Sequence, residues 1–401
     1  MTSMQHKFGA LDLIRAGLQD LDRARTLFDE LHNDGIDDDR MRLLLATLEK
    51  ACDPDIALSN LVDIIKVMQS QGKDFTNIIA DENSFVRLIT VLGVSDEMGK
   101  LMRFRPELVE AAANDACESH LYNHEQRRAH VLKSVGVDPN DHTMPTASLP
   151  LAEAATALRK TYRKQLAAIM AQDATANDPI EIQPRISTEL SDLADAALEG
   201  ALAIARHEVD GSEHVRFAII GMGKLGAQEL NYVSDVDLIY VVEPADMDTN
   251  GMALSRIGTK MATTLQRVCQ SVIMGVAEPT LWQIDGGLRP EGKDGPLVRR
   301  LESHEAYYEQ WAENWEFQAL LKARPVAGDT DLGQAYMDMT RPFVWTASKR
   351  DNFVYDCQQM RKRVEDLIPN PLKDREIKLG RGGLRDVEFT VQMLQLVHEI
   401  G

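Results

Sequence analysis

The sequence predicts an α+β fold that is predominantly helical, with one small mixed β-sheet flanked by helical regions on both sides. Two observations predict this class. Apolar residues recur at three- and four-residue steps through both ends of the 401-residue chain, as they do in amphipathic helices. Between these ends, short β-branched runs surround one further helical segment, which is typical of a small sheet with a helix against it.

Residues 1–140 are expected to form an N-terminal helical region. Apolar residues share one face in each of two segments, and Pro54 stands near a helix start, where its missing N–H costs little. The polar, turn-rich residues 135–148 mark the boundary. The two apolar faces are Leu11, Ile14, Leu18 and Leu21 in one segment and Leu58, Leu61, Ile65 and Met68 in the other.

Residues 141–300 are expected to contain the sheet and the helices that lead into it. One helix starts near Leu151, and a second opens at Ser187, whose hydroxyl group suits an N-cap. A third helix, around Met261, separates the second strand from the third. The expected strands are Val215 to Ile220, Asp235 to Val242 and Thr280 to Ile284.

Residues 301–401 are expected to form a C-terminal helical domain. Tyr307 to about Ala323 is interpreted as one helix that Pro325 stops, because the residue before a proline disfavours helical geometry. Two further helices follow, each with an apolar stripe. The stripes are Phe353, Cys357, Met360, Val364 and Leu367 in one helix and Leu384, Val387, Val391 and Leu394 in the other.

The composition argues against nucleic acid and membranes as partners. The net charge is −19, whereas a nucleic-acid binder needs a basic surface. No apolar run approaches the length of a membrane span, and the N-terminus lacks the apolar segment of a secretion signal. Cys52, Cys117, Cys269 and Cys357 lack metal or redox spacing, so we expect reduced cysteines in a cytoplasmic protein.

Asp235 and Asp237 are the first candidate catalytic residues. They lie two apart at the start of an expected strand, so both carboxylates leave the same face. Two like charges so close are unfavourable unless a cation lies between them, and Mg²⁺ prefers such hard oxygen ligands. The alternative interpretation of Asp-Val-Asp is a solvated turn before a strand.

A glycine-rich segment precedes this pair. Gly221-Met222-Gly223-Lys224-Leu225-Gly226 follows an expected strand directly. Its glycines would let backbone N–H groups approach a phosphate, and Lys224 adds a point charge. The segment matches neither the P-loop nor the dinucleotide-binding pattern, and a plain tight turn is the alternative.

A third carboxylate, Asp285, ends the third expected strand and could complete a two-metal site. Arg289 and Lys293 follow closely and could meet phosphate oxygens. Lys322 and Arg324 end an expected helix and either face the same cleft or remain solvated.

The segment Lys378-Leu379-Gly380-Arg381-Gly382-Gly383 precedes the last helix. A glycine-rich turn at a helix N-terminus can bind an anion, and an ordinary turn between helices is the alternative. Glu388, one to two turns into that helix, could reach inward.

Four blocks in this order resemble the bifunctional glutamine synthetase adenylyltransferase/adenylyl-removing enzyme family, which belongs to the DNA polymerase β-like nucleotidyltransferase superfamily. The resemblance covers residues 80–401 well and the first 80 residues more loosely. One departure is Gly287, where many members have an arginine two residues after the third carboxylate. The blocks are residues 221–239, with Gly-Met-Gly-Lys-Leu-Gly and Ser-Asp-Val-Asp, 285–298, with Leu-Arg-Pro-Glu-Gly, 315–329, with Lys-Ala-Arg, and 380–389, with Gly-Arg-Gly-Gly.

The resemblance implies that Asp235, Asp237 and Asp285 hold Mg²⁺ while phosphate attacks adenylyl-tyrosine of glutamine synthetase, releasing ADP and free tyrosine. The implied partners are adenylylated glutamine synthetase, the PII signalling protein, phosphate, ADP and ATP. The implied nucleotide or phosphate contacts are Gly223, Lys224, Gly226, Ser234, Arg289, Lys322, Arg324, Arg381 and Glu388.

The family has two catalytic modules in one chain, and two features indicate the N-terminal, adenylyl-removing module. The chain opens with Met and a helical leader, and its late motif is Gly-Arg-Gly-Gly where the attaching module tends to have Gly-Pro-Gly-Gly. A single Asp-x-Asp block of this kind suggests a fragment of a longer protein. Tyrosine adenylylation from ATP, another nucleotidyl transfer, and a non-catalytic docking module stay open as alternatives.

Overall fold

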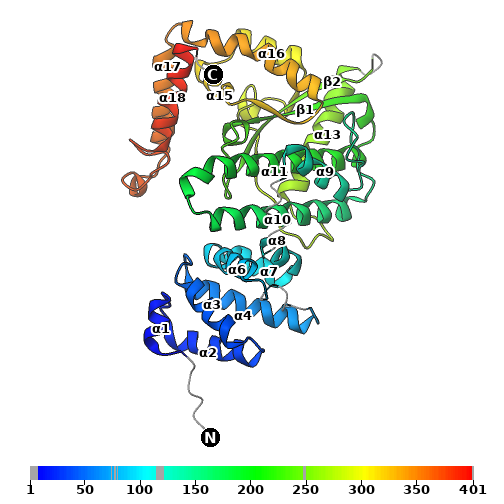
Figure 1. Ribbon diagram of the computed structural model, residues 1–401. Coiled ribbons are helices and arrows are strands. Elements are labelled where there is room, and N and C mark those ends of the chain that lie inside the picture. The colour runs from blue at the N-terminus through cyan, green and yellow to red at the C-terminus, as the bar shows by residue number, and fades with distance from the viewer. Residues whose placement is uncertain are drawn as a thin grey trace. The chain divides into compact units, whose positions relative to one another are not determined.

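The computed structural model describes residues 8–399, apart from residues 74, 76, 77, 79, 114–121 and 247–249 (Figure 1). The described chain is mostly helical with one small mixed sheet, which confirms the predicted fold class. It divides into two compact units. The first unit comprises residues 1–126 and 160–193, and the second comprises residues 127–159 and 194–401. The division into residues 1–140, 141–300 and 301–401 that the sequence suggested stays a prediction.

The first unit is a helical array around one apolar core. Five of its helices start behind an Asp or Ser side chain that accepts a hydrogen bond from a first-turn N–H group, which explains where they begin. Its helices are α1 (Ala10–Arg15), α2 (Leu21–Asn33), α3 (Asp38–Leu48), α4 (Pro54–Ser70), α6 (Glu82–Val94), α7 (Asp96–Phe104) and α8 (Pro106–Ala113).

One predicted apolar face in this unit is confirmed and the other is wrong. Leu58, Leu61, Ile65 and Met68 of α4 are all buried in the core. The segment from Leu11 to Leu21 is not one helix, because α1 ends at Arg15 and Gly17 takes a left-handed conformation (φ +81°). Leu11 and Ile14 are consequently exposed.

Three further helices follow along the chain: α9 (His124–Ser134), α10 (Leu151–Thr175) and α11 (Pro179–Glu208). The expected start of α11 at Ser187 is wrong by eight residues. The Asp178 side chain accepts from the N–H groups of Ile180 and Glu181 and so caps the helix earlier. Pro179 occupies the first position, where a proline fits without losing a hydrogen bond.

The sheet lies in the second unit and has the strand order β3-β2-β1-β5, with β4 also paired to β2. The pair β1–β2 is antiparallel, as is β1–β5, whereas β3 and β4 run parallel to β2. The strands are β1 (Val215–Met222), β2 (Val236–Pro244), β3 (Ile284–Asp285), β4 (Val298–Arg299) and β5 (Arg324–Gly328).

The third strand is shorter than predicted and includes only Ile284 and Asp285. The buried Arg159 guanidinium group donates to the carbonyl groups of Val268, Ser271 and Glu278. Within the expected strand, the Leu281 N–H group donates to the Cys269 carbonyl group at the end of α13 instead of to a neighbouring strand. Only the last residues of the segment pair with β2.

The expected single helix from Tyr307 to Ala323 is also wrong. The structure has α14 (Leu301–Gln310) and α15 (Asn314–Leu320), separated at Trp311. Glu313 and Glu316 form a capping box that starts α15. Pro325 does not end a helix but lies in β5, where a proline is tolerated because this strand is at the edge of the sheet.

Helices cover both faces of the sheet. Helix α13 (Gly251–Gln270) contacts β1, β2 and β4. Alternate residues on the other face, including Ile220, Ile239 and Val241, join an apolar core with the C-terminal helices. These helices are α14, α15, α16 (Thr330–Thr346), α17 (Phe353–Asp366) and α18 (Leu384–His398), which are coloured from yellow to red in Figure 1.

The predicted last helix is confirmed as α18, and its apolar stripe is exposed. The four stripe residues, Leu384, Val387, Val391 and Leu394, are between 49% and 66% exposed. The helix buries Leu396 and Gln392, whose amide oxygen accepts from Gln318 of α15.

Three cysteines, Cys52, Cys269 and Cys357, are free thiols, and Cys117 lies outside the described residues. No helix in the described part of the chain has the length and apolarity needed to cross a membrane.

Candidate active site

Three aspartates lie at one end of the sheet. Asp237 pairs with Met222 in the antiparallel β1–β2 register and with Asp285 in the parallel β2–β3 register, and Asp235 immediately precedes β2. Because side chains alternate along a strand, Asp237 shares a face with Ile239 and Val241. The Asp237 carboxylate therefore leaves the sheet on the side covered by α14 to α18.

The Asp237 carboxyl group is held in an electrostatically unfavourable position for an anion. Burial, together with the neighbouring charges of Asp235 and Asp285, raises its pKa to about 6, while Arg385 and Lys378 act in the opposite direction. A divalent cation between such carboxylates would relieve the repulsion, and all three supply the oxygen ligands that Mg²⁺ prefers.

The three carboxylates are near one another but not gathered tightly. No oxygen triplet from Asp235, Asp237 and Asp285, all of them described residues, lies within 4.8 Å of one another. Like charges are expected to stay apart without a cation between them. Asp235 and Asp285 line one pocket of about 300 Å³ together with Arg289 and Lys293.

The glycine-rich segment forms a short helix, α12 (Gly223–Gly226), directly after β1. Gly223 has φ +54°, and a Cβ atom there would stand 2.6 Å from Asp237 Oδ2. A Cβ atom at Gly226 would overlap the carbonyl oxygen of Lys322. Both glycines are therefore required by close approach, the first to a candidate metal ligand and the second to the start of β5.

Arg324 fixes this segment from behind. Its guanidinium group donates to both oxygens of Asp195 at 2.6 and 3.2 Å, and to the carbonyl groups of Leu225 and Gly226 at 3.0 and 3.2 Å. The Asp195 side chain is fully buried. Arg324 thus holds the glycine-rich segment in place, whereas the sequence suggested that it meets a phosphate.

Arg289 stabilises the loop after Asp285 in the same way. Its guanidinium group donates to the carbonyl groups of Gly286, Lys293 and Gly295. The N–H group of Gly287 donates to Asp285 Oδ1 at 2.7 Å, and a Cβ atom at Gly287 would stand 2.9 Å from that oxygen. The glycine at this position therefore leaves room for the carboxylate.

Two candidate residues meet in one ion-pair network. Lys322 Nζ donates to Glu229 and to Glu388, both at 2.9 Å, and Arg385 Nη1 donates to Glu388 at 2.7 Å. Burial alone would raise the pKa of Glu388, but Lys322, Arg385 and Lys224 lower it. Glu388 is therefore an anion that binds cationic side chains.

Lys224 lies beside this network. With the Asn231 amide oriented to satisfy both of its neighbours, the amide oxygen accepts from Lys224 Nζ at 3.3 Å. Ser234 is half-buried and directly precedes Asp235. Both residues lie in the segment between β1 and β2, which also contains Asp235.

The turn before α18 places its basic residues differently from the sequence expectation. Arg381 is exposed, whereas Arg385 and Lys378 act on the Asp237 carboxyl group. Sequence reasoning missed Arg385, although a signal existed. Residues three apart share a helix face, so the prediction that Glu388 reaches inward also implied that Arg385 lies on the same side.

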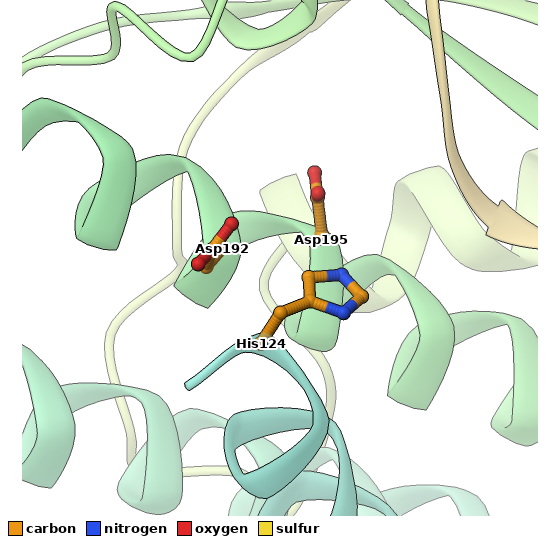
Figure 2. Close-up of side chains that lie close together, drawn as sticks. All are labelled: His124, Asp192 and Asp195. Carbon is orange, nitrogen blue, oxygen red and sulfur yellow. The ribbon is translucent and has the colours of Figure 1, made fainter. Parts of the chain in front are cut away.

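A different cluster has metal-compatible side chains. Among the described residues, His124 of α9 and Asp192 of α11, both in the first unit, have ligand atoms within 4.8 Å of each other (Figure 2). Figure 2 also shows Asp195, one turn further along α11. Both Asp195 oxygens already accept from Arg324, so we assign no metal to this cluster.

A family model described as "Glutamate-ammonia ligase adenylyltransferase" matches residues 85–339, and one described as "GlnD PII-uridylyltransferase" matches residues 358–401. The first match includes all five strands and the three aspartates.

Similar proteins carry the name bifunctional glutamine synthetase adenylyltransferase/adenylyl-removing enzyme. One from Bifidobacterium longum (strain DJO10A) is 75% identical, over 99% of this chain and 37% of its own length. One from Cutibacterium acnes is 42% identical, over 97% of this chain and 39% of its own length. One from Streptomyces avermitilis is 41% identical, over 96% of this chain and 36% of its own length.

The chain thus spans little more than a third of the length of these relatives. The first family model nevertheless covers well over half of the chain, and three of the four sequence blocks and the sheet-end aspartates lie within the match. The chain belongs to the glutamate-ammonia ligase adenylyltransferase family.

Proposed function

We propose that this chain removes AMP from adenylylated glutamine synthetase by Mg²⁺-dependent phosphorolysis. The observation that carries the proposal is the convergence of Asp235, Asp237 and Asp285 at one sheet end, beside a glycine-rich segment and basic side chains. Relatives that cover nearly all of this chain have adenylyltransferase and adenylyl-removing enzyme in their names.

In the proposed reaction, an oxygen of inorganic phosphate forms a bond to the adenylyl phosphorus, and the bond from phosphorus to the tyrosine oxygen breaks. ADP results, and the tyrosine oxygen takes up a proton. The three aspartates would hold Mg²⁺, which supplies neutralisation of charge on the phosphoryl oxygens. The chain's other residues bind and orient the substrates.

Lys224 and the backbone N–H groups of Gly223 to Gly226 are proposed to bind phosphate oxygens. Lys322 and Ser234 are proposed as further contacts, and Arg381, which is exposed, is proposed to contribute least. Arg289 and Arg324 are proposed to act indirectly, because their guanidinium groups hold the two loops that carry the site. Glu388 is proposed to position cations.

The proposal also covers the setting of the reaction. The cytoplasm is the proposed compartment, in agreement with three free thiols among the described cysteines. Adenylylated glutamine synthetase is the proposed protein substrate, and the PII signalling protein is the proposed regulator. The match of residues 358–401 to a PII-uridylyltransferase family model is compatible with a related C-terminal helical domain.

One second candidate is favoured by the family description itself, which names an adenylyltransferase. The reverse assignment, transfer of AMP from ATP to tyrosine, would use the same three aspartates. Because both directions use the same metal ligands, only an assay with the substrates of each direction can distinguish them.

The test is incubation of the chain with adenylylated glutamine synthetase, Mg²⁺ and phosphate, with ADP followed by chromatography. We expect ADP that disappears without phosphate and in the Asp235→Asn variant. AMP transfer from ATP to unmodified glutamine synthetase, with no ADP from the first mixture, would establish the second candidate instead. A folded, Mg²⁺-binding chain that forms neither product would contradict both.

A further inference from the structure

We propose that Arg385 is a further substrate-binding residue, whose guanidinium group binds phosphate oxygens of the nucleotide, and that Glu388 is the positioning residue that orients it. The inference rests on the proposed function in one respect, because it requires a nucleoside phosphate at the three aspartates. It adds a residue outside the sheet and the loops around it to the binding site.

The backbone around Arg385 is firmly held. Its N–H group donates to the Lys378 carbonyl group at 2.9 Å, in the first turn of α18. Arg361 of α17 donates to the carbonyl groups of Leu379 and Gly380 at 3.0 and 2.9 Å and to Asp386 at 2.5 Å. A side chain that starts from so constrained a backbone loses little further freedom when it binds a ligand.

The Arg385 side chain differs from the other arginines near the site. Arg289 and Arg324 each donate to acceptors on several sides. Among the described residues, the Arg385 guanidinium group donates only to Glu388, through Nη1, and the side chain is 32% exposed. Most of its N–H groups are therefore available, and the planar guanidinium group suits two phosphate oxygens at once.

Glu388 connects Arg385 to the site. The same carboxylate accepts from Arg385 at 2.7 Å and from Lys322 at 2.9 Å. The carbonyl group of Lys322 in turn lies where a Cβ atom at Gly226 would be. One carboxylate on α18 thus links the glycine-rich segment, the start of β5 and the last helix.

The glycine-rich segment joins Arg385 to the aspartates. Gly223 lies against Asp237 and Gly226 lies against Lys322, and Lys322 shares the Glu388 carboxylate with Arg385. A phosphate group between a metal-bearing carboxylate cluster and Arg385 would be neutralised from both sides.

The test measures binding of ADP with Mg²⁺ by calorimetry in four variants of the full chain. Arg385→Gln should weaken ADP binding about tenfold to a hundredfold, as expected for loss of hydrogen bonds to a charged group. Arg385→Lys should restore part of the affinity. Glu388→Gln should weaken binding by a smaller factor, because Arg385 remains but is no longer oriented.

Arg375→Gln is the matched control, because it removes the same charge from an exposed position in the segment between α17 and α18. It should bind ADP as the unmodified chain does. Thermal unfolding of each variant separates loss of binding from loss of fold.

Equal ADP affinity in Arg385→Gln and Arg375→Gln would overturn the proposal, and so would an unmodified chain that binds no ADP with Mg²⁺. Reduced binding in Arg385→Gln would support it even if the phosphorolysis assay yields no ADP. That result would leave the binding residue established and the direction of the reaction wrong.

Discussion

The two glycine-rich turns of the second unit are similar in sequence and different in surroundings. Each places a basic residue among glycines, and each is held by an arginine that donates to two of its carbonyl groups. Arg324 holds residues 221–226 through Leu225 and Gly226, and Arg361 holds residues 378–383 through Leu379 and Gly380.

The difference lies in what the glycines approach. In the first turn, a Cβ atom at Gly223 would collide with Asp237 of β2, and one at Gly226 would collide with Lys322 in the turn before β5. At Gly380 and Gly383 it would meet carbonyl groups of the preceding segment, and at Gly382 nothing within 4 Å. The first turn is built to approach the site, whereas the second is built to start a helix.

The comparison predicts its largest effect at the two holding arginines. Arg324→Met leaves the fully buried Asp195 carboxylate without its cation, so we expect a loss of about 3–5 kcal/mol in the free energy of unfolding. Arg361→Met should cost less, because its partner Asp386 is 35% exposed and can be solvated by water. Denaturant unfolding of both variants checks the order, and equal losses would contradict it.

A second prediction compares the effect of adding a methyl group at one glycine of each turn. Gly226→Ala forces a methyl group against the Lys322 carbonyl group, so we expect a loss of about 3 kcal/mol in stability and loss of turnover. Gly382→Ala should cost only about 1 kcal/mol for its left-handed conformation (φ +77°) and keep turnover. A Gly226→Ala variant with normal stability and turnover would remove the steric basis of the comparison.

The pH dependence of stability should differ between the turns because of the carboxylates beside them. Burial raises the pKa of Asp237 to about 6, so its contribution to stability is complete below about pH 4 and is lost as the pH rises through 6. Asp386 has the opposite pH dependence, because the hydrogen bond from the Gly382 N–H group lowers its pKa. Its contribution to stability is lost as the pH falls below about 4.

Asp237→Asn should therefore stabilise the metal-free chain at pH 7.5. The gain is up to about 3 kcal/mol, which corresponds to the difference between a pKa of about 6 and the ordinary value of 3.8. The gain should shrink at pH 4, where the unmodified carboxyl group is protonated. Thermal unfolding at both pH values without divalent metal measures this, and a destabilised variant at pH 7.5 would count against the assigned repulsion.

The smallest effect is expected at Arg381, which is exposed in the second turn. Arg381→Ala should change stability by no more than about 0.5 kcal/mol and ADP affinity by about twofold or less. Unfolding and ADP calorimetry measure both quantities. A loss as large as that expected for Arg385→Gln would show that the second turn contacts the nucleotide after all.

The sequence predicted those parts of the fold that are encoded by local periodicity. The runs that became β1 and β2 are apolar and β-branched, and Asp235 and Asp237 share a face because a strand repeats every two residues. The break between α14 and α15 was also encoded locally, in the Glu313 and Glu316 capping box, and was overlooked.

Other features depend on distant partners and could not be deduced from local patterns. Arg159 bonds the segment before β3, and Arg324 pairs with Asp195, 129 residues away. Which side of α18 is buried depends on α15 and α17. Residue type predicted that basic groups gather near the aspartates, and only tertiary structure separates those that hold loops from those that face substrate.

The most direct test of the account is where the chain binds a divalent cation. Mn²⁺ binding at pH 7.5, followed by electron paramagnetic resonance, should be strong in the unmodified chain and in Asp192→Asn, which alters the cluster of Figure 2. Binding should be lost in Asp235→Asn and Asp285→Asn. Retained binding in both of these variants, with loss in Asp192→Asn, would contradict the assignment of the metal to the sheet-end aspartates.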